Sequence, residues 1–135
     1  MTKFRTRMWT AGEKIMLQDV LRNLQFHNQP TWVLFEFFGV GRAPNGLEMS
    51  VFEKKVLDSP SGYQFNSVEF HESVESLQDV SDVTLIGVLG DQRKIVEIKG
   101  MDSTYWEIWF DDAAAHFSAA ADQANSQASS WHEVP

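Results

Sequence analysis

The sequence predicts an α+β domain with a mostly antiparallel sheet and with helices packed on one face of that sheet. Three runs of apolar and β-branched residues, joined by short turns, lie in the second half of the chain and predict an antiparallel meander. Segments with helical spacing of apolar residues lie before this meander. With 135 residues and a hydrophobic fraction of 43%, the chain can form one domain with a substantial core. We expect residues 1–123 to form this domain and residues 124–135 to form a polar C-terminal tail.

The first 30 residues predict a strand followed by a helix. Residues 4–9 are aromatic and partly alternating, which indicates an opening strand. Thr10 and Glu13 match a capping box, in which each side chain accepts a hydrogen bond from the backbone of the other residue. Pro30 disfavours helical geometry at the residue before it. We therefore expect a helix over about residues 11–26, with an apolar face formed by Leu17, Val20, Leu21 and Leu24.

The middle of the chain predicts a central strand and its neighbours. Residues 31–38 are almost entirely apolar, β-branched or aromatic, as in a strand buried on both faces. A glycine-rich loop follows, so we expect residues 47–57 to return as a strand paired with residues 31–38. Phe52 and Val56 leave a helix open as the alternative, because they are four residues apart. The expected strand positions here are Leu47, Met49 and Val51, and a further short strand is expected at Tyr63 and Phe65.

From Ser67 onward the sequence predicts a helix, a meander and a last helix. Phe70, Val74 and Leu77 recur at helical spacing, and the acidic face of this helix carries Glu69, Glu72 and Glu75. Asp111 is placed to cap a final alanine-rich helix over residues 112–124. The three strands of the meander are expected at residues 83–89, 93–99 and 104–110.

Charge and composition narrow the classes of partner. The net charge of −8 repels phosphate backbones, which argues against nucleic-acid binding and suits docking on a basic protein, although it also serves solubility. The chain has no cysteine, which excludes disulfides, thiolate catalysis and cysteine-ligated zinc. No apolar run approaches the ~20 residues of a membrane helix, and the basic start lacks the apolar region of a secretory signal. We expect a cytoplasmic protein without a cofactor.

Glu97 and Lys99 lie two residues apart on an apolar strand, which is half of a pattern found in metal-dependent nucleases. The period of two places both side chains on one face of the strand. A second carboxylate would be needed to hold a divalent metal, and Asp82 is the candidate that a hairpin brings near Lys99. A cross-strand charge pattern on a solvated face is the other interpretation of the same residues.

The next strand alternates between two sets of large side chains. If Trp106, Ile108 and Phe110 face the core, then Tyr105, Glu107 and Trp109 face outward. Exposed aromatic residues beside a carboxylate are typical of protein interfaces. A helix that covers this second face as well would instead make the aromatic residues part of the core.

Two resemblances to known families follow from these patterns. The run at residues 102–107, near the end of a meander in a short, acidic, cysteine-free α+β chain, resembles small immunity proteins of bacterial polymorphic toxin systems. This resemblance implies a stoichiometric inhibitor that plugs the active site of a toxin. The runs at residues 3–9 and 13–16 are similar to the opening of phage YopX-type proteins, which implies an origin in a mobile element and no particular chemistry.

The sequence therefore predicts a non-catalytic binding protein, most directly an immunity-type inhibitor of a toxic enzyme. Its partner would be a basic toxin domain, met by acidic side chains around aromatic anchors. The alternatives are a small nuclease that uses Asp82, Glu97 and Lys99, and a phage accessory protein. The contact surface expected for the inhibitor consists of Tyr105, Glu107, Trp109, Glu69, Glu72 and Glu75.

Overall fold

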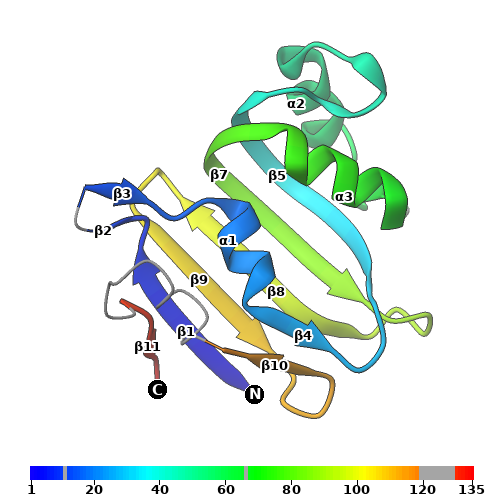
Figure 1. The fold of residues 1–135 in the computed structure, drawn as a ribbon. Coiled ribbons are helices and arrows are strands. Elements are labelled where there is room, and N and C mark those ends of the chain that lie inside the picture. Colours follow the sequence, from blue (N-terminus) through cyan, green and yellow to red (C-terminus); the bar gives the residue numbers. More distant parts are fainter. Residues whose placement is uncertain (11, 66, 119–129) are drawn as a thin grey trace.

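The structure is a computed structural model that describes residues 1–10, 12–65, 67–118 and 130–135. It confirms the predicted α+β class: a seven-stranded sheet has the order β11-β1-β9-β8-β7-β5-β6, and each neighbouring pair is antiparallel (Figure 1). Two further two-stranded sheets join β10 to β4 and β2 to β3. In chain order the elements are β1 (Thr2–Arg7), β2 (Trp9–Thr10), β3 (Glu13–Lys14), α1 (Leu17–Arg22), β4 (Leu24–Phe26), β5 (Thr31–Gly41), the 3₁₀ turn η1 (Pro44–Gly46), α2 (Met49–Leu57), β6 (Tyr63–Phe65), α3 (Ser67–Ser76), β7 (Leu77–Val88), β8 (Lys94–Met101), β9 (Tyr105–Phe110), β10 (Ala115–Phe117) and β11 (His132–Glu133).

The core lies between one face of the seven-stranded sheet and the helices. Phe70 of α3 stacks on Trp32 of β5, with ring centroids 4.9 Å apart. Phe52 of α2 meets Phe37 of the same strand edge-to-face at 5.5 Å. Figure 1 shows α1 and α3 in front of the sheet. The buried side chains that the sheet contributes to this core include Trp32, Leu34, Phe37, Val83, Leu85, Val96, Ile98, Trp106, Ile108 and Phe110.

The meander and the acidic helix are confirmed. Strands β7, β8 and β9 are consecutive antiparallel neighbours, and β7 begins earlier than expected because Leu77 already belongs to it. Helix α3 buries Phe70 and Val74, the first two positions of the predicted apolar face. Strand β5 covers the predicted central strand and extends it to Gly41. The patterns of the meander and of α3 agree with their burial, whereas Phe35, Glu36 and Phe38 of β5 are exposed, so this strand is not buried on both faces as expected.

The predicted helix over residues 11–26 is wrong in most of its length. Thr10 and Glu13, expected as a capping box, are instead paired across the hairpin of β2 and β3. Gly12 in the turn has a φ of +82°, a conformation that favours glycine. Helix α1 begins only after Met16, whose N–H donates to the Asp19 carboxylate at 2.9 Å. The apolar spacing identified the centre of the helix and overestimated its length.

The expectation of a strand over residues 47–57 is also wrong, because residues 49–57 form helix α2. Phe52 and Val56 are buried one turn apart, so the helical alternative describes this segment. Strand β5 already has a neighbour on each edge, because β7 pairs along one edge and β6 pairs with the start of the other. Residues 47–57 therefore do not pair with β5 as a strand. The glycine-rich loop before it contains η1.

The end of the chain adds strands. A last helix over residues 112–124 is wrong for its described part: a turn leads into β10, which pairs with β4. Residues 119–124 lie outside the described residues. Within the predicted tail, residues 130–135 include β11, which pairs with β1, and Trp131, which is buried against Phe117 with ring centroids 5.0 Å apart. The sheet thus includes residues from both ends of the sequence.

Within the described residues, no helix has the length and apolar character required to cross a membrane.

Candidate functional site

The candidate site is the face of the sheet opposite the core, which we call the open face. All three described helices pack on the other face, through residues such as Leu17, Phe52 and Phe70. Strand register and the period of two assign the outward side chains. They are Lys3, Arg5 and Arg7 on β1, Tyr105, Glu107 and Trp109 on β9, Glu97, Lys99 and Met101 on β8, Asp82, Thr84 and Ile86 on β7, and Val33, Glu36 and Phe38 on β5.

Cross-strand pairing arranges these side chains in rows. One row contains charged and polar side chains only: Arg5, Glu107, Lys99, Thr84 and Glu36. A second row mixes charged, aromatic and aliphatic side chains: Lys3, Trp109, Glu97, Ile86, Val33 and, on β6, Gln64. Arg5, Glu107 and Lys99 alternate in sign across three neighbouring strands, and cross-strand pairs of opposite charge stabilise a sheet.

Glu107 is the most strongly held of the predicted contact residues. Its carboxylate accepts hydrogen bonds from Arg5 at 2.6 and 3.1 Å and lies 3.2 Å from the Lys3 ammonium. Burial raises the pKa of Glu107, but the hydrogen bonds and charges of Arg5 and Lys3 outweigh burial and hold that pKa below its ordinary value. Glu107 is therefore an ionised carboxylate in a fixed position, with much of its charge balanced by its own neighbours.

Tyr105 and Trp109 are both on the open face, as their alternation with Trp106 predicts. Tyr105 is 37% exposed, whereas Trp106 on the same strand is fully buried. The Trp109 ring is half-buried, and the Lys94 ammonium lies 4.3 Å from its centroid. The described helices leave both rings accessible on this face, so the interpretation in which a helix covers them does not hold for the described part of the chain.

The nuclease residues are on the open face as well, but the structure does not bring them together. The Asp82 carboxylate accepts the Asp102 N–H at 2.9 Å. Glu97 pairs with Ile86, four residues along β7 from Asp82, which corresponds to roughly 13 Å at about 3.3 Å per residue. The Glu97 carboxylate instead forms an ion pair with the Lys94 ammonium at 3.7 Å. Within the described residues no group of three His, Cys, Asp or Glu side chains could hold a metal ion.

The acidic residues of α3 lie on the other side of the sheet from Tyr105, Glu107 and Trp109. Glu72 and Glu75 are exposed, while the Glu69 carboxylate accepts a hydrogen bond from the Tyr63 hydroxyl at 3.0 Å. The six residues predicted as one contact surface thus divide between two faces of the molecule. A single partner domain that packs against one face meets only half of them.

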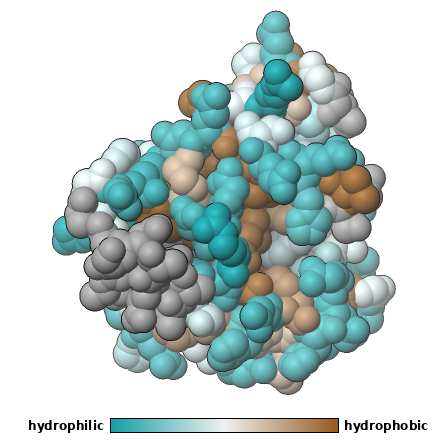
Figure 2. All heavy atoms as spheres, in the orientation of Figure 1, coloured by the Kyte–Doolittle hydropathy of each residue, from teal (hydrophilic) through white to brown (hydrophobic). Residues whose placement is uncertain are grey.

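Two grooves flank α3 on the helical side. A groove of about 610 Å³ runs between α3 and residues 41–49, with Glu69 and Glu72 on its wall. A second groove, of about 500 Å³, lies between α1 and α3, with Glu75 at its rim and Trp32 at its floor. Figure 2 shows apolar surface between polar side chains on this side of the molecule. Both volumes fall in the range of ligand pockets, about 300–1,000 Å³.

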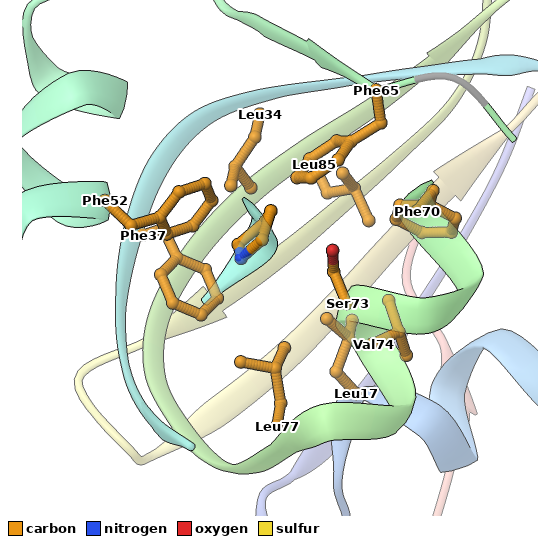
Figure 3. A pocket seen from close by; sticks show the side chains of 11 residues that line it. Leu17, Leu34, Phe37, Phe52, Phe65, Phe70, Ser73, Val74, Leu77 and Leu85 are labelled. Carbon is orange, nitrogen blue, oxygen red and sulfur yellow. The ribbon is translucent and has the colours of Figure 1, made fainter. Parts of the chain in front are cut away.

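A third, much smaller space lies inside the core beneath α3 (Figure 3). Its volume is about 20 Å³, and its wall is apolar apart from Ser73. The Ser73 hydroxyl donates to the Glu69 backbone carbonyl at 2.6 Å, so it does not offer a free polar group to a ligand. This space is a packing void of at most about one water and not a binding site.

In comparisons with known proteins, no family model, curated protein or solved structure matches the chain.

Proposed function

We propose that the chain is a non-catalytic binding protein, most directly an immunity-type inhibitor that occludes the active site of a toxic enzyme in the cytoplasm. The observation that carries the proposal is the open face, where Tyr105 and Trp109 stand accessible among side chains held by ion pairs. Aromatic side chains of this kind supply most of the binding energy at protein interfaces.

The charged side chains of the open face act mainly by holding this surface in a fixed arrangement, and less by attracting a partner over distance. Glu107 is held by Lys3 and Arg5, and Lys94 lies over the Trp109 ring. Such a surface binds without having to order its side chains, and that ordering is one of the main free-energy costs of association. The net charge of −8 attracts a basic partner over distance, which raises the rate of association.

The mechanism would be occlusion. A basic catalytic domain approaches the acidic chain, and the aromatic side chains fill the centre of its cleft while the surrounding ion pairs exclude water. Because the acidic residues of α3 lie on the opposite side, we assign the contact to the open face and treat the helical side as the competing surface.

A co-expression experiment tests this function. The product of the adjacent gene is expressed in a bacterial host with and without this chain, and growth and the enzymatic activity of the purified product are measured. We expect restored growth and complete loss of that activity at an equimolar ratio. Absence of both protection and binding would refute the inhibitor function.

Variants of the two faces then identify the contact surface. The double change Tyr105→Ala and Trp109→Ala is expected to abolish protection, whereas Glu72→Lys with Glu75→Lys is expected to leave it intact. Leu57→Ala, an exposed apolar position on α2, serves as the control. The opposite pattern of the two double variants would move the contact to the helical side.

A further inference from the structure

Three neighbouring strands carry the cations of the open face. Strands β1, β9 and β8 lie side by side in the sheet (Figure 1). They contain five of the 11 lysine and arginine residues but only two of the 19 aspartate and glutamate residues, which gives them a net charge of +3 in a chain of −8. We call the outward side of these strands the basic platform. Its residues are Lys3, Arg5, Arg7, Lys94, Glu97, Lys99, Tyr105, Glu107 and Trp109.

Strand register joins these side chains into one surface. The three cations of β1 pair with the three outward residues of β9: Arg7 with Tyr105, Arg5 with Glu107 and Lys3 with Trp109. On the other side of β9, Lys99 pairs with Glu107 and Glu97 pairs with Trp109. The Lys94 ammonium lies 4.3 Å from the centroid of the Trp109 ring, so it belongs to the same surface. The basic platform thus has its aromatic rings on the central strand and cations on both flanking strands.

The cations of the basic platform are more exposed than its carboxylates. The side chains of Lys3, Arg5 and Lys94 are 36%, 40% and 39% exposed. The side chains of Glu107 and Glu97 are only 15% and 23% exposed, and both carboxylates are already held in ion pairs with these cations. A ligand that approaches the platform therefore meets ammonium and guanidinium groups first.

Two cations of the basic platform are left to a ligand. Within the described residues, neither Arg7 nor Lys99 forms an ion pair with a carboxylate. The positive charge ends toward β7, where the Asp82 carboxylate accepts the Asp102 N–H at 2.9 Å. The net charge of the whole chain, which argues against nucleic-acid binding, is thus an average over a surface on which these three strands have the opposite sign.

The arrangement of the basic platform selects among anionic ligands. Proteins bind single-stranded nucleic acid with aromatic rings on which bases stack, beside cations that meet the phosphates. Tyr105 is 37% exposed and offers such a ring, and Glu107 follows it on the same face of the strand. A carboxylate at this place can accept hydrogen bonds from the amino groups of bases. The same carboxylate repels an acidic peptide or the headgroups of an anionic membrane, so single-stranded nucleic acid fits the platform best.

We propose that the basic platform binds single-stranded nucleic acid, with a base stacked on Tyr105 and with phosphates at Arg7 and Lys99. Trp109 lies four residues from Tyr105 on the same strand, roughly 13 Å at about 3.3 Å per residue, so the two rings contact different nucleotides. The inference goes beyond the proposed function and does not depend on it, because it requires no partner protein.

Fluorescence anisotropy of labelled single-stranded RNA and DNA, each of about 12 nucleotides and of the same mixed sequence, tests the inference between about 50 and about 200 mM salt. We expect binding that weakens as the salt concentration rises. The double change Arg7→Gln and Lys99→Gln should make the slope of log affinity against log salt shallower by about 1.4, because each phosphate contact of a single strand contributes about 0.7. Lys54→Gln with Lys55→Gln is the matched control: it removes the same charge from exposed positions of α2 and should leave the slope unchanged.

A second pair of variants tests stacking. Tyr105→Ala should raise Kd at least about fivefold at every salt concentration, whereas Tyr105→Phe should keep the Kd of the unmodified chain, because stacking requires the ring and not the hydroxyl. The thermal unfolding of each variant is compared with that of the unmodified chain, and the Arg7 and Lys99 variant serves if Tyr105→Ala fails to fold.

The outcomes separate this inference from the proposed function. Absence of binding to both oligonucleotides refutes the inference and leaves the inhibitor function intact. Binding that the folded platform variants do not weaken, or that the α2 variant weakens equally, also refutes it. Displacement of the oligonucleotide by a glutamate-rich peptide or by vesicles of anionic lipid at equal concentration would overturn the assignment to nucleic acid. Weaker binding by a folded platform variant, with none of these results, supports the basic platform.

Discussion

Replacing Trp106 by phenylalanine tests how the N-terminal segment is attached to the sheet. Trp106 is fully buried on the core side of β9, and its indole N–H donates to the Ile15 carbonyl at 2.8 Å. Ile15 lies between the hairpin of β2 and β3 and helix α1, so this bond connects both to the central sheet. Phenylalanine keeps an aromatic ring but can neither donate this hydrogen bond nor fill the whole site.

Two terms set the expected loss of stability. The carbonyl of Ile15 loses its partner in a partly buried position, and such a loss costs about 1–3 kcal/mol. The phenyl ring is roughly 40 Å³ smaller than indole, and a cavity of that size costs about 1 kcal/mol at about 24 cal/mol per Å³. We therefore expect Trp106→Phe to lower the free energy of unfolding by about 3 kcal/mol.

The measurement is equilibrium unfolding in urea, with an unchanged m-value as the sign that only stability has changed. Trp109→Phe is the matched control, three residues along the same strand on the open face, and we expect it to cost less than about 1 kcal/mol. Equal losses for the two variants would contradict the assignment of the two faces and the importance of the bond to Ile15.

Three further predictions concern other contacts. In the same urea assay, Gly100→Ala should lower the free energy of unfolding by about 1–3 kcal/mol, because a Cβ at this position would lie 2.9 Å from the Trp106 ring. Gly90→Ala is the control: a Cβ there meets no atom within 4 Å, and the free energy of unfolding should change by less than about 0.5 kcal/mol. The folded chain holds the pKa of Glu107 below its ordinary value of 4.5, so the ion pairs of Glu107 stabilise the fold above that pH, and this stabilisation is lost as the pH falls through the lowered pKa. In urea unfolding at pH 7 and at about pH 3, Glu107→Gln should therefore lose less stability on acidification than the unmodified chain. An identical loss for the two chains would contradict the role of the ion pairs. The side-chain amide of Gln18 donates to the carbonyls of Val74 and Leu77 at 2.8 Å each, so Gln18→Leu should lower the melting temperature and speed amide hydrogen exchange in α1. Unchanged exchange would show that the Gln18 side chain does not hold α1 to α3.

Local patterns sufficed where they agreed with the tertiary contacts. Helix α3 and the strands of the meander each show one period only, and the apolar positions in phase with that period are buried, as Phe70 and Val74 are on α3 and Trp106, Ile108 and Phe110 are on β9. Residues 47–57 show both periods, and the sequence offers no local reason to choose. This segment forms a helix because helical spacing lets both Phe52 and Val56 pack into the core, while strands β6 and β7 already pair with β5.

The alanine-rich segment illustrates the opposite error. Alanine has the highest helix propensity, which favoured a helix after Asp111. Instead Ala115 and Phe117 are buried on either side of exposed His116, in a strand that pairs with β4. Pairing with a segment some 90 residues earlier outweighs a propensity of a few tenths of a kcal/mol per residue.

For the candidate site, alternation along β9 determined which side chains share a face, because a period of two is a property of the strand alone. The sequence by itself thus separated Tyr105, Glu107 and Trp109 from Trp106 and its neighbours. Which of these faces the helices cover depends on how distant segments pair and pack, and no local pattern contains that information. Only the tertiary structure placed the acidic residues of α3 on the far side of the sheet. It also left Trp9 exposed on its hairpin, because Thr10 pairs with Glu13 across a turn that contains Gly12.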